Sequence, residues 1–222
     1  EEACLTALAF AEICRQAGLP DGALNVVSGL GAEAGAALTA HPLVHHISFT
    51  GSVGVGKMIQ STSAQNAVPV TLELGGKSPQ LVFDDADLDA ALPFLVNAGI
   101  QNAGQTCSAS SRILVQRGVY DNVVARMAKR YGELRVGPAG YDLDLGPLVS
   151  LRQKEIVEGF LARGADLNKV AVGAVAPDAP IGGAYVPPTL FADVDPNHEL
   201  AQQEIFGPVQ VVIPFDTDED AV

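Results

Sequence analysis

The sequence predicts an α/β fold built around a parallel sheet, and three observations point to it. Segments with helical periodicity alternate with short β-rich segments, most regularly before residue 76. Glycines stand where a strand would turn into the next helix, at Gly29–Gly31, Gly51 and Gly75–Gly76. Hydrophobic residues make up 48% of the 222 residues and charged residues 18%, which permits a proper core and argues against disorder. Helices that alternate with strands in this way typically cover a parallel sheet.

The first expected element is a helix. Leu5, Leu8, Ala9 and Ile13 fall at i, i+3, i+4 and i+8, which gives an apolar face that ends at Gly18. The later segments predict, in chain order, strands at 23–28, 45–50, 68–74, 80–83, 112–116 and 209–215, and helices at 32–40, 53–64, from 84 or 85 to about 98, 120–130 and 151–163. The Gly/Pro-rich segment 173–188 is expected to be mostly loop.

The Gly75–Gly76 pair is the best candidate for a domain boundary, which gives domains at 1–75 and 76–222. The chain begins without Met, close to a helical pattern. It ends soon after Asp216–Asp220, which looks like a helix cap followed by an acidic first turn. We therefore expect a central piece of a longer protein, with the second domain truncated at its C-terminal end.

Charge and composition argue against nucleic-acid binding, a membrane span and a metal site. The formal net charge of −13 disfavours nucleic-acid binding, although a few local backbone N–H groups can still hold the phosphates of a nucleotide cofactor. No apolar run is long enough to span a membrane, and Glu1-Glu2 does not open a signal peptide. Three cysteines without metal-ligand spacing predict a reducing, cytoplasmic compartment and no metal site.

Two glycine-rich turns follow predicted strands. Gly29–Gly35 and Gly51–Gly56 would each lead from a strand into a helix, whose N-terminus can hold a phosphate. Neither has the usual dinucleotide-binding spacing, so ordinary strand-to-helix turns remain the alternative.

Three short segments carry residues that suggest chemistry. Cys107 lies among small polar residues, unlike Cys4 and Cys14 in their helical segment, and a thiolate there would be a nucleophile. Glu73 is a carboxylate in an otherwise apolar strand, where partial burial would suit a general base. The turn Glu204–Pro208 combines a carboxylate with an aromatic residue. The alternatives are a structural cysteine, a solvent-facing glutamate and a surface loop with a packed Phe.

Two other clusters of polar residues are less convincing as functional sites. His41, His45 and His46 lead into a strand that would direct the adjacent pair to opposite faces, which disfavours zinc. The acidic run Asp84–Asp89 fits a helix start better than a paired-carboxylate hydrolase site.

Taken together, Leu72–Pro79, Gly104–Cys107 and Glu204–Pro208 resemble the aldehyde dehydrogenase superfamily, with support from Phe49–Ser52 and Asp144–Pro147. The resemblance covers the whole chain. It implies the C-terminal half of a Rossmann-like cofactor domain at 1–75, followed by an incomplete catalytic α/β domain at 76–222.

The resemblance also implies catalytic roles. Cys107 would attack the aldehyde carbon to give a thiohemiacetal, which passes a hydride to the nicotinamide. Glu73 would activate the water that hydrolyses the resulting thioester. Glu204 would hold the nicotinamide ribose, and Phe206 would pack beside the nicotinamide.

The remaining cofactor contacts are implied for the first domain. Ser52, after Gly51 at a helix start, would face the pyrophosphate, and Gly31 and Val55 would lie near the adenine. Glu1 matches the acidic residue that holds the adenosine ribose, which favours NAD over NADP. Leu74 completes the set of cofactor-binding residues.

The implied function is NAD-dependent oxidation of a small-molecule aldehyde to a carboxylic acid, in an enzyme that forms a homo-oligomer. Members of the family that transfer the acyl group to coenzyme A tend to lack the base at Glu73, so a free acid is the expected product. The Asn of the oxyanion hole and the Lys that precedes the Glu1 position in the family are not in this chain, so we expect the isolated chain to be nearly inactive. The alternatives are a catalytically silent structural fragment and a cysteine-dependent hydrolase.

Overall fold

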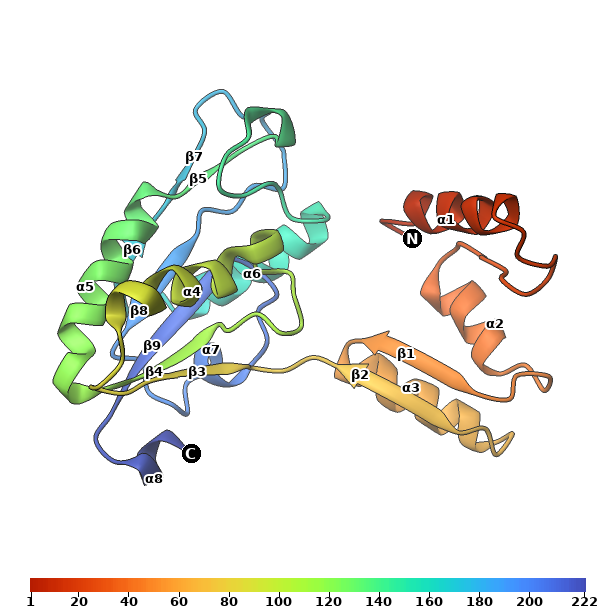
Figure 1. Cartoon of the computed structure of the whole chain (residues 1–222), viewed down its shortest axis with the longest axis horizontal. Helices are drawn as coiled ribbons and strands as arrows, with labels where there is room; N and C mark the ends of the chain where they lie inside the picture. The colour runs from red at the N-terminus through yellow and green to blue at the C-terminus, as the bar shows by residue number, and fades with distance from the viewer. The chain divides into compact units, whose positions relative to one another are not determined.

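The computed structural model describes all residues from 1 to 222, and they divide into two compact units, Glu1–Gly75 and Gly76–Val222. The boundary between these units, called unit 1 and unit 2 below, falls between the paired glycines. Each unit combines helices with strands, so the predicted α/β class is confirmed (Figure 1).

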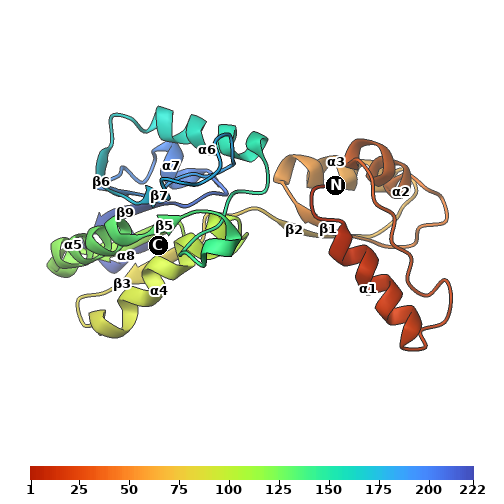
Figure 2. The same cartoon turned by 90° about the horizontal axis from the view of Figure 1, so that it is seen from above.

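Unit 1 contains a two-stranded parallel sheet in which β1 and β2 are paired from Ile47↔Val70 to Gly51↔Leu74. Helix α3 connects the two strands and lies along them, as both views show (Figures 1 and 2). The elements of unit 1 are α1 (Leu5–Gln16), a π-helical turn (Gly31–Gly35), α2 (Ala36–Thr39), β1 (Ile47–Gly51), α3 (Val53–Ala64) and β2 (Val70–Leu74).

The strand expected at 23–28 is wrong, because this segment has no strand structure. A strand needs a hydrogen-bonding neighbour, and in this unit β1 and β2 pair only with each other. The β-rich composition of the segment was therefore not sufficient.

Unit 2 contains a five-stranded sheet in the order β3-β4-β9-β8-β6, in which only β6 is antiparallel to its neighbour. A short parallel pair, β5 and β7, lies apart from this sheet. The strands are β3 (Pro79–Val82), β4 (Arg112–Gln116), β5 (Arg135–Val136), β6 (Asn168–Val172), β7 (Ala174–Val175), β8 (Thr189–Ala192) and β9 (Val209–Phe215).

The helices of unit 2 pack against this sheet to form one continuous hydrophobic core, which includes Ile113, Met127 and Phe191. They are α4 (Leu88–Ile100), α5 (Arg117–Glu133), α6 (Leu151–Arg163), α7 (Glu199–Gln202) and α8 (Asp218–Ala221), with 3₁₀ turns at Gln101–Gly104 and Ala139–Tyr141. Asp87 caps α4, and not Asp84 or Asp85 as expected, because its side chain accepts from the N–H groups of Asp89 and Ala90.

No helix of either unit has the length and apolar character needed to cross a bilayer.

Candidate active site

The start of α3 is the part of unit 1 best suited to hold phosphate. Ser52 is the N-cap, and its side chain accepts a long hydrogen bond of 3.4 Å from the N–H of Val55. Gly51 ends β1 directly before it, and a Cβ on Gly54, the second residue of α3, would meet nothing within 4 Å. The first N–H groups of a helix have no partner within it, so this open N-terminus can receive an anion.

Glu73 and Leu74 lie beside this turn. In the parallel ladder Glu73 is opposite Thr50 and Leu74 is opposite Gly51, so both are at the carboxyl ends of the strands. Leu74 also packs against α3, where a Cβ on Gly56 would lie 2.6 Å from its Cδ2. Ligands of parallel α/β sheets bind at this edge. The structure therefore brings Gly51, Ser52, Val55, Glu73 and Leu74 together.

The other two predicted contacts in unit 1 are placed elsewhere. Glu1 is an exposed chain terminus without a hydrogen bond, and Gly31 begins the π-helical turn. Neither residue hydrogen-bonds to the start of α3.

Cys107 lies in unit 2 on the loop between α4 and β4, and it is the exposed cysteine, whereas Cys4 and Cys14 are half-buried. The backbone before it adopts left-handed φ values at Asn102 (51°), Ala103 (55°) and Gly104 (76°). Left-handed backbone is costly for residues other than glycine and clusters at functional sites. Nothing in the sequence indicated this conformation at Asn102 and Ala103.

Gln105 fastens the N-terminal side of this loop. Its Nε2 donates to the carbonyl of Asn102 at 3.0 Å, and its Oε1 accepts from the N–H of Val149 at 2.9 Å. Beyond the cysteine, the N–H of Ala109 donates to the carbonyl of Thr106 at 2.9 Å, which closes a tight turn around Cys107.

The turn that carries Glu204 and Phe206 packs directly against the Cys107 loop. A Cβ on Gly104 would lie 2.1 Å from the carbonyl oxygen of Gly207, so only glycine fits there. Phe206 has a φ of 56° and is 37% exposed, and its carbonyl accepts from Gln153 Nε2 at 3.0 Å. The structure thus brings Cys107, Glu204 and Phe206 into neighbouring segments of unit 2.

Burial changes the pKa values of two charged residues at this turn. It raises the pKa of Glu204, although the N–H of Gly76 and the ammonium of Lys77 counteract it. Burial lowers the pKa of Lys77 to about 8, helped by the charge of Arg112 and opposed by Glu204. Lys77 Nζ and Arg112 Nε are both buried without a hydrogen-bond partner. Sequence reasoning did not single out either cation.

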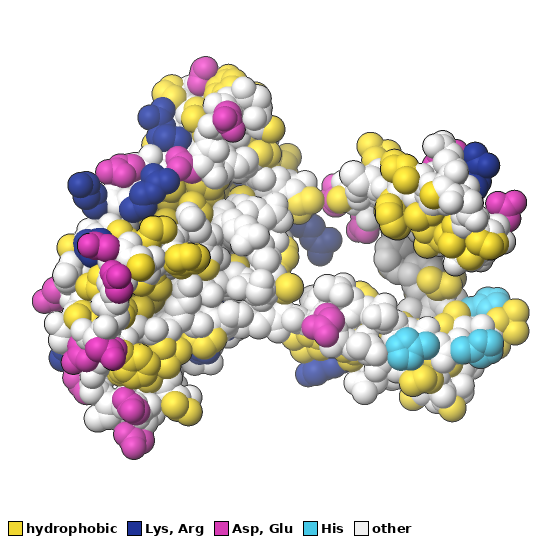
Figure 3. All heavy atoms as spheres, in the orientation of Figure 1, with side chains coloured by type: hydrophobic (Ala, Val, Ile, Leu, Met, Phe, Trp, Pro, Cys, Tyr) yellow, Lys and Arg dark blue, Asp and Glu magenta, His cyan; other side chains and the backbone are white.

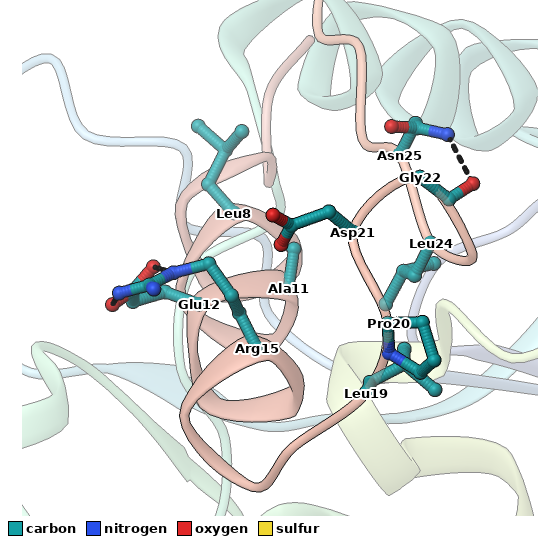
Figure 4. A pocket seen from close by; sticks show the side chains of 10 residues that line it. All are labelled: Leu8, Ala11, Glu12, Arg15, Leu19, Pro20, Asp21, Gly22, Leu24 and Asn25. Atoms are coloured by element: carbon teal, nitrogen blue, oxygen red, sulfur yellow. Dashed lines mark hydrogen bonds and ion pairs between the residues drawn. The ribbon is translucent and has the colours of Figure 1, made fainter.

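The larger hollows of the surface lie away from these residues. One of about 340 Å³ lies between α1 and the loop 19–25, where Arg15 is paired with Glu12 (Figure 4). Another of about 590 Å³ lies between α4 and α5. Neither is lined by a predicted site residue. The hollow at the Cys107 loop is only about 10 Å³ and is lined by residues that include Thr106, Glu204 and Phe206.

The histidines have other partners. His46 Nε2 is 3.1 Å from Thr71 Oγ1, and His198 caps α7 by accepting from the N–H of Leu200. No group of three or more His, Cys, Asp or Glu side chains is placed to hold a metal ion, and no histidine hydrogen-bonds to Cys107.

Comparison with known proteins gives a consistent result. The model of the "Aldehyde dehydrogenase family" matches residues 1–222. A betaine aldehyde dehydrogenase of Cereibacter sphaeroides is 43% identical over 220 residues, which is 98% of this chain and 45% of that protein. The chain spans about 45% of the length of the curated relatives it matches.

Solved structures agree. Betaine aldehyde dehydrogenase from Staphylococcus aureus in complex with NAD⁺ is 32% identical, with a TM-score of 0.92 over 98% of this chain and 44% of that chain. A cysteine-to-alanine mutant of aldehyde dehydrogenase C from Pseudomonas syringae, complexed with NAD⁺ and octanal, is 38% identical, with a TM-score of 0.91 over 99% of this chain and 46% of that chain.

Proposed function

Because the chain belongs to the aldehyde dehydrogenase family, we propose that it carries the nucleophile, the base and part of the cofactor site of an NAD-dependent enzyme that oxidises an aldehyde to a carboxylic acid. The observation that carries the proposal is the placement of Cys107. It is an exposed thiol on a loop that is fastened by Gln105 and packed against the Glu204–Phe206 turn.

The residues of unit 1 fit a dinucleotide, because the open N-terminus of α3 follows a parallel strand. Ser52 and the free N–H groups beside it would hold the pyrophosphate, Gly31 and Val55 would lie near the adenine, and Leu74 would also contact the cofactor. Glu1 would hold the adenosine ribose, which favours NAD over NADP. In unit 2 Glu204 would accept hydrogen bonds from the nicotinamide ribose, and Phe206 would pack beside the ring.

Cys107 performs the first covalent step. Its sulfur adds to the aldehyde carbon, and the carbonyl oxygen takes up a proton to give a thiohemiacetal. Bound NAD⁺ would accept the hydride that leaves this carbon. With the loss of the hydride from carbon and of the hydroxyl proton to water, the thiohemiacetal becomes a thioester on Cys107, which is a good acyl donor.

Glu73 performs the second step. Its carboxylate takes a proton from water, the hydroxide attacks the thioester carbonyl, and the thiolate of Cys107 leaves with the release of a carboxylic acid. Glu73 is exposed at the end of β2 and not partly buried as the sequence suggested, so that water can reach it. General-base catalysis of this kind typically contributes about 10²–10⁴-fold.

We propose an aldehyde as the substrate without naming one, because the names of the relatives mention both betaine aldehyde and octanal. We further propose a homo-oligomer in a reducing, cytoplasmic compartment, which is consistent with three free cysteines.

The test compares three thiols in one chain. Brief treatment with iodoacetamide followed by peptide mapping should label Cys107 before Cys4 and Cys14, and an added aldehyde should protect Cys107 alone. Equal labelling, or protection of all three, would contradict the role of Cys107.

The base is tested with two matched glutamates of unit 1. In a full-length version of the enzyme incubated with aldehyde and NAD⁺, Glu73→Gln should accumulate an acyl adduct on Cys107 detectable by mass spectrometry. Glu33→Gln, another exposed glutamate, should behave as the parent. Adduct levels that do not differ between the two variants would remove Glu73 from the mechanism.

A further inference from the structure

Gln210 is a polar residue in an otherwise apolar place. It lies on β9, the central strand of the five-stranded sheet, between Val209 and Val211, and its exposed fraction is 0%. A buried amide is costly unless its hydrogen-bonding groups are satisfied. Its partners therefore reveal what it does.

Both N–H donors of the Gln210 side chain are used. Nε2 donates to the carbonyl of Leu95 on α4 at 2.9 Å and to the carbonyl of Ser110 at 2.6 Å. Oε1 accepts from the hydroxyl of Tyr131 on α5. Burial raises the pKa of Tyr131, so its hydroxyl keeps the proton that it donates.

The fold makes room for this amide at one position. A Cβ on Gly99 of α4 would lie 2.0 Å from Cδ of Gln210, so no larger residue fits there without displacing the side chain. Glycine in a helix interior is unfavourable. Its presence at this point is explained by the approach of the Gln210 side chain.

The bond to Ser110 reaches the segment that follows the nucleophile. The next carbonyl, that of Ser111, accepts from the backbone N–H of Val211 at 2.9 Å. Two neighbouring residues of β9 thus hold two consecutive carbonyls, one through a side chain and one through the backbone. Gln105 and Gly104 secure the other side of the loop.

We propose that Gln210 is a positioning residue, whose amide fixes the Cys107 loop by holding the Ser110 carbonyl and thereby sets the orientation of the thiol for addition to the aldehyde. The inference rests on the proposed function of Cys107. Gln210 touches no reacting atom and acts through the loop backbone.

The test compares a variant that removes all three hydrogen bonds of Gln210 with one that removes a single bond. Gln210→Met has a similar volume but no donor, so it frees the Ser110 carbonyl. Tyr131→Phe removes the third hydrogen bond and leaves both bonds from Nε2 in place. Both variants should lower stability, and only the first should loosen the loop.

Hydrogen exchange provides the first readout. In Gln210→Met the amides of residues 105–111 should exchange about tenfold faster, the scale of one lost hydrogen bond. In Tyr131→Phe the ratio of the exchange rates of these loop amides to those of the α6 amides should be the same as in the parent. The second readout is the aldehyde concentration that half-protects Cys107 from iodoacetamide, which should rise in Gln210→Met and remain unchanged in Tyr131→Phe.

Two outcomes would overturn the proposal. One is loop exchange and aldehyde protection in Gln210→Met that match the parent, and the other is an equal change in both variants. If parent Cys107 is itself no more reactive than Cys4 and Cys14, the proposed function fails instead. That result is visible before any variant is compared.

If Gln210→Met does not fold, NMR measurements on the parent chain can still test the proposal. The side-chain amide protons of Gln210 should exchange slowly in NMR spectra, and their resonances should shift when Cys107 is alkylated. Resonances that exchange rapidly, or that do not respond to alkylation, would refute the link between the amide and the loop.

Discussion

Units 1 and 2 both alternate helices with strands, but they differ greatly in how many of their residues are buried. In unit 1 only Ile47, Gly56, Ile59 and Ser63 are buried, and α1 buries none of its residues. In unit 2 six of the seven residues of β9 are buried, and four of them belong to one continuous hydrophobic core. Unit 1 instead exposes large apolar side chains on α1 and on the later segments of the unit (Figure 3): Leu5, Phe10, Ile13, Val27, Leu38 and Met58.

The difference shows that an amphipathic pattern specifies an element but not its stability. Most of the stability of a helix in a protein comes from packing of its apolar face, and α1 has no such packing. Unit 2 packs helices against five strands and can hold the strained Cys107 loop in one conformation. The proposed nucleophile therefore lies in the unit with the larger buried core, whereas the proposed phosphate site lies in the unit with few buried residues.

The largest expected effect comes from removing the same side chain in each unit. Phe191 on β8 is 0% exposed, and Phe10 on α1 is 59% exposed. Phe191→Ala should lower the free energy of unfolding by about 3–5 kcal/mol, whereas Phe10→Ala should change it by less than about 0.5 kcal/mol. All four tyrosines belong to unit 2, so urea unfolding is followed by tyrosine fluorescence for that unit and by circular dichroism for the whole chain.

A loss in Phe10→Ala comparable to that in Phe191→Ala would show that α1 is packed in solution. The contrast between the units would then be wrong.

Local pattern was sufficient where an element is defined by its own residues. The predicted bounds of 53–64, 112–116, 151–163 and 209–215 agree with α3, β4, α6 and β9. The chain divides into its two compact units between Gly75 and Gly76, and the assignment of these units as domains of a cofactor-binding enzyme stays a prediction. Ser52 and Ser150 cap the two helices, β4 alternates in burial, and β9 is a β-rich run of seven residues that follows Pro208.

Tertiary context decided the rest. Strand β8 consists of four buried residues without alternation, so its sequence carries no strand period. Strand β6 was missed next to the Gly/Pro-rich segment. At the site, Cys107 stood out by its polar neighbours, but the left-handed Asn102 and the amide of Gln210 depend on contacts that no local pattern encodes.

A second pair of variants compares two glycines. Gly104 in unit 2 has a φ of +76° and no room for a Cβ, whereas Gly54 in α3 of unit 1 has open space around it. Gly104→Ala should destabilise unit 2 by about 1–3 kcal/mol, because strained backbone and a collision with Gly207 are both imposed. Gly54→Ala should stabilise α3 by about 0.5–1 kcal/mol. The tyrosine signal measures the first change and circular dichroism the second. An unchanged unfolding curve for Gly104→Ala would show that the contact with Gly207 is loose.

The smallest expected effect concerns one acidic residue in each unit. Burial raises the pKa of Asp144, but the N–H of Arg135 and the guanidinium of Arg130 outweigh it and hold the pKa below its usual range. Hydrogen bonds from Arg15 and Gln16 lower the pKa of Glu12 to about 2, but its pair with Arg15 is exposed to solvent on α1. Solvent screens such a pair, so the low pKa of Glu12 does not translate into stability.

A carboxylate with a lowered folded-state pKa contributes stability above its unfolded pKa, about 3.9 for Asp, and loses it as the pH falls through the folded value. At pH 7 Asp144→Asn should therefore lower the free energy of unfolding of unit 2 by roughly 1 kcal/mol. Below about pH 4 the gap to the parent should close, because the parent carboxylate becomes protonated as well. Glu12→Gln should leave the unfolding curve unchanged at every pH. Urea titrations at a series of pH values measure both variants. If the difference in the free energy of unfolding between Asp144→Asn and the parent persists in acid, the effect of the substitution comes from packing and not from charge. If Glu12→Gln lowers the free energy of unfolding in a pH-dependent way, α1 is held in place by contacts outside its own helix.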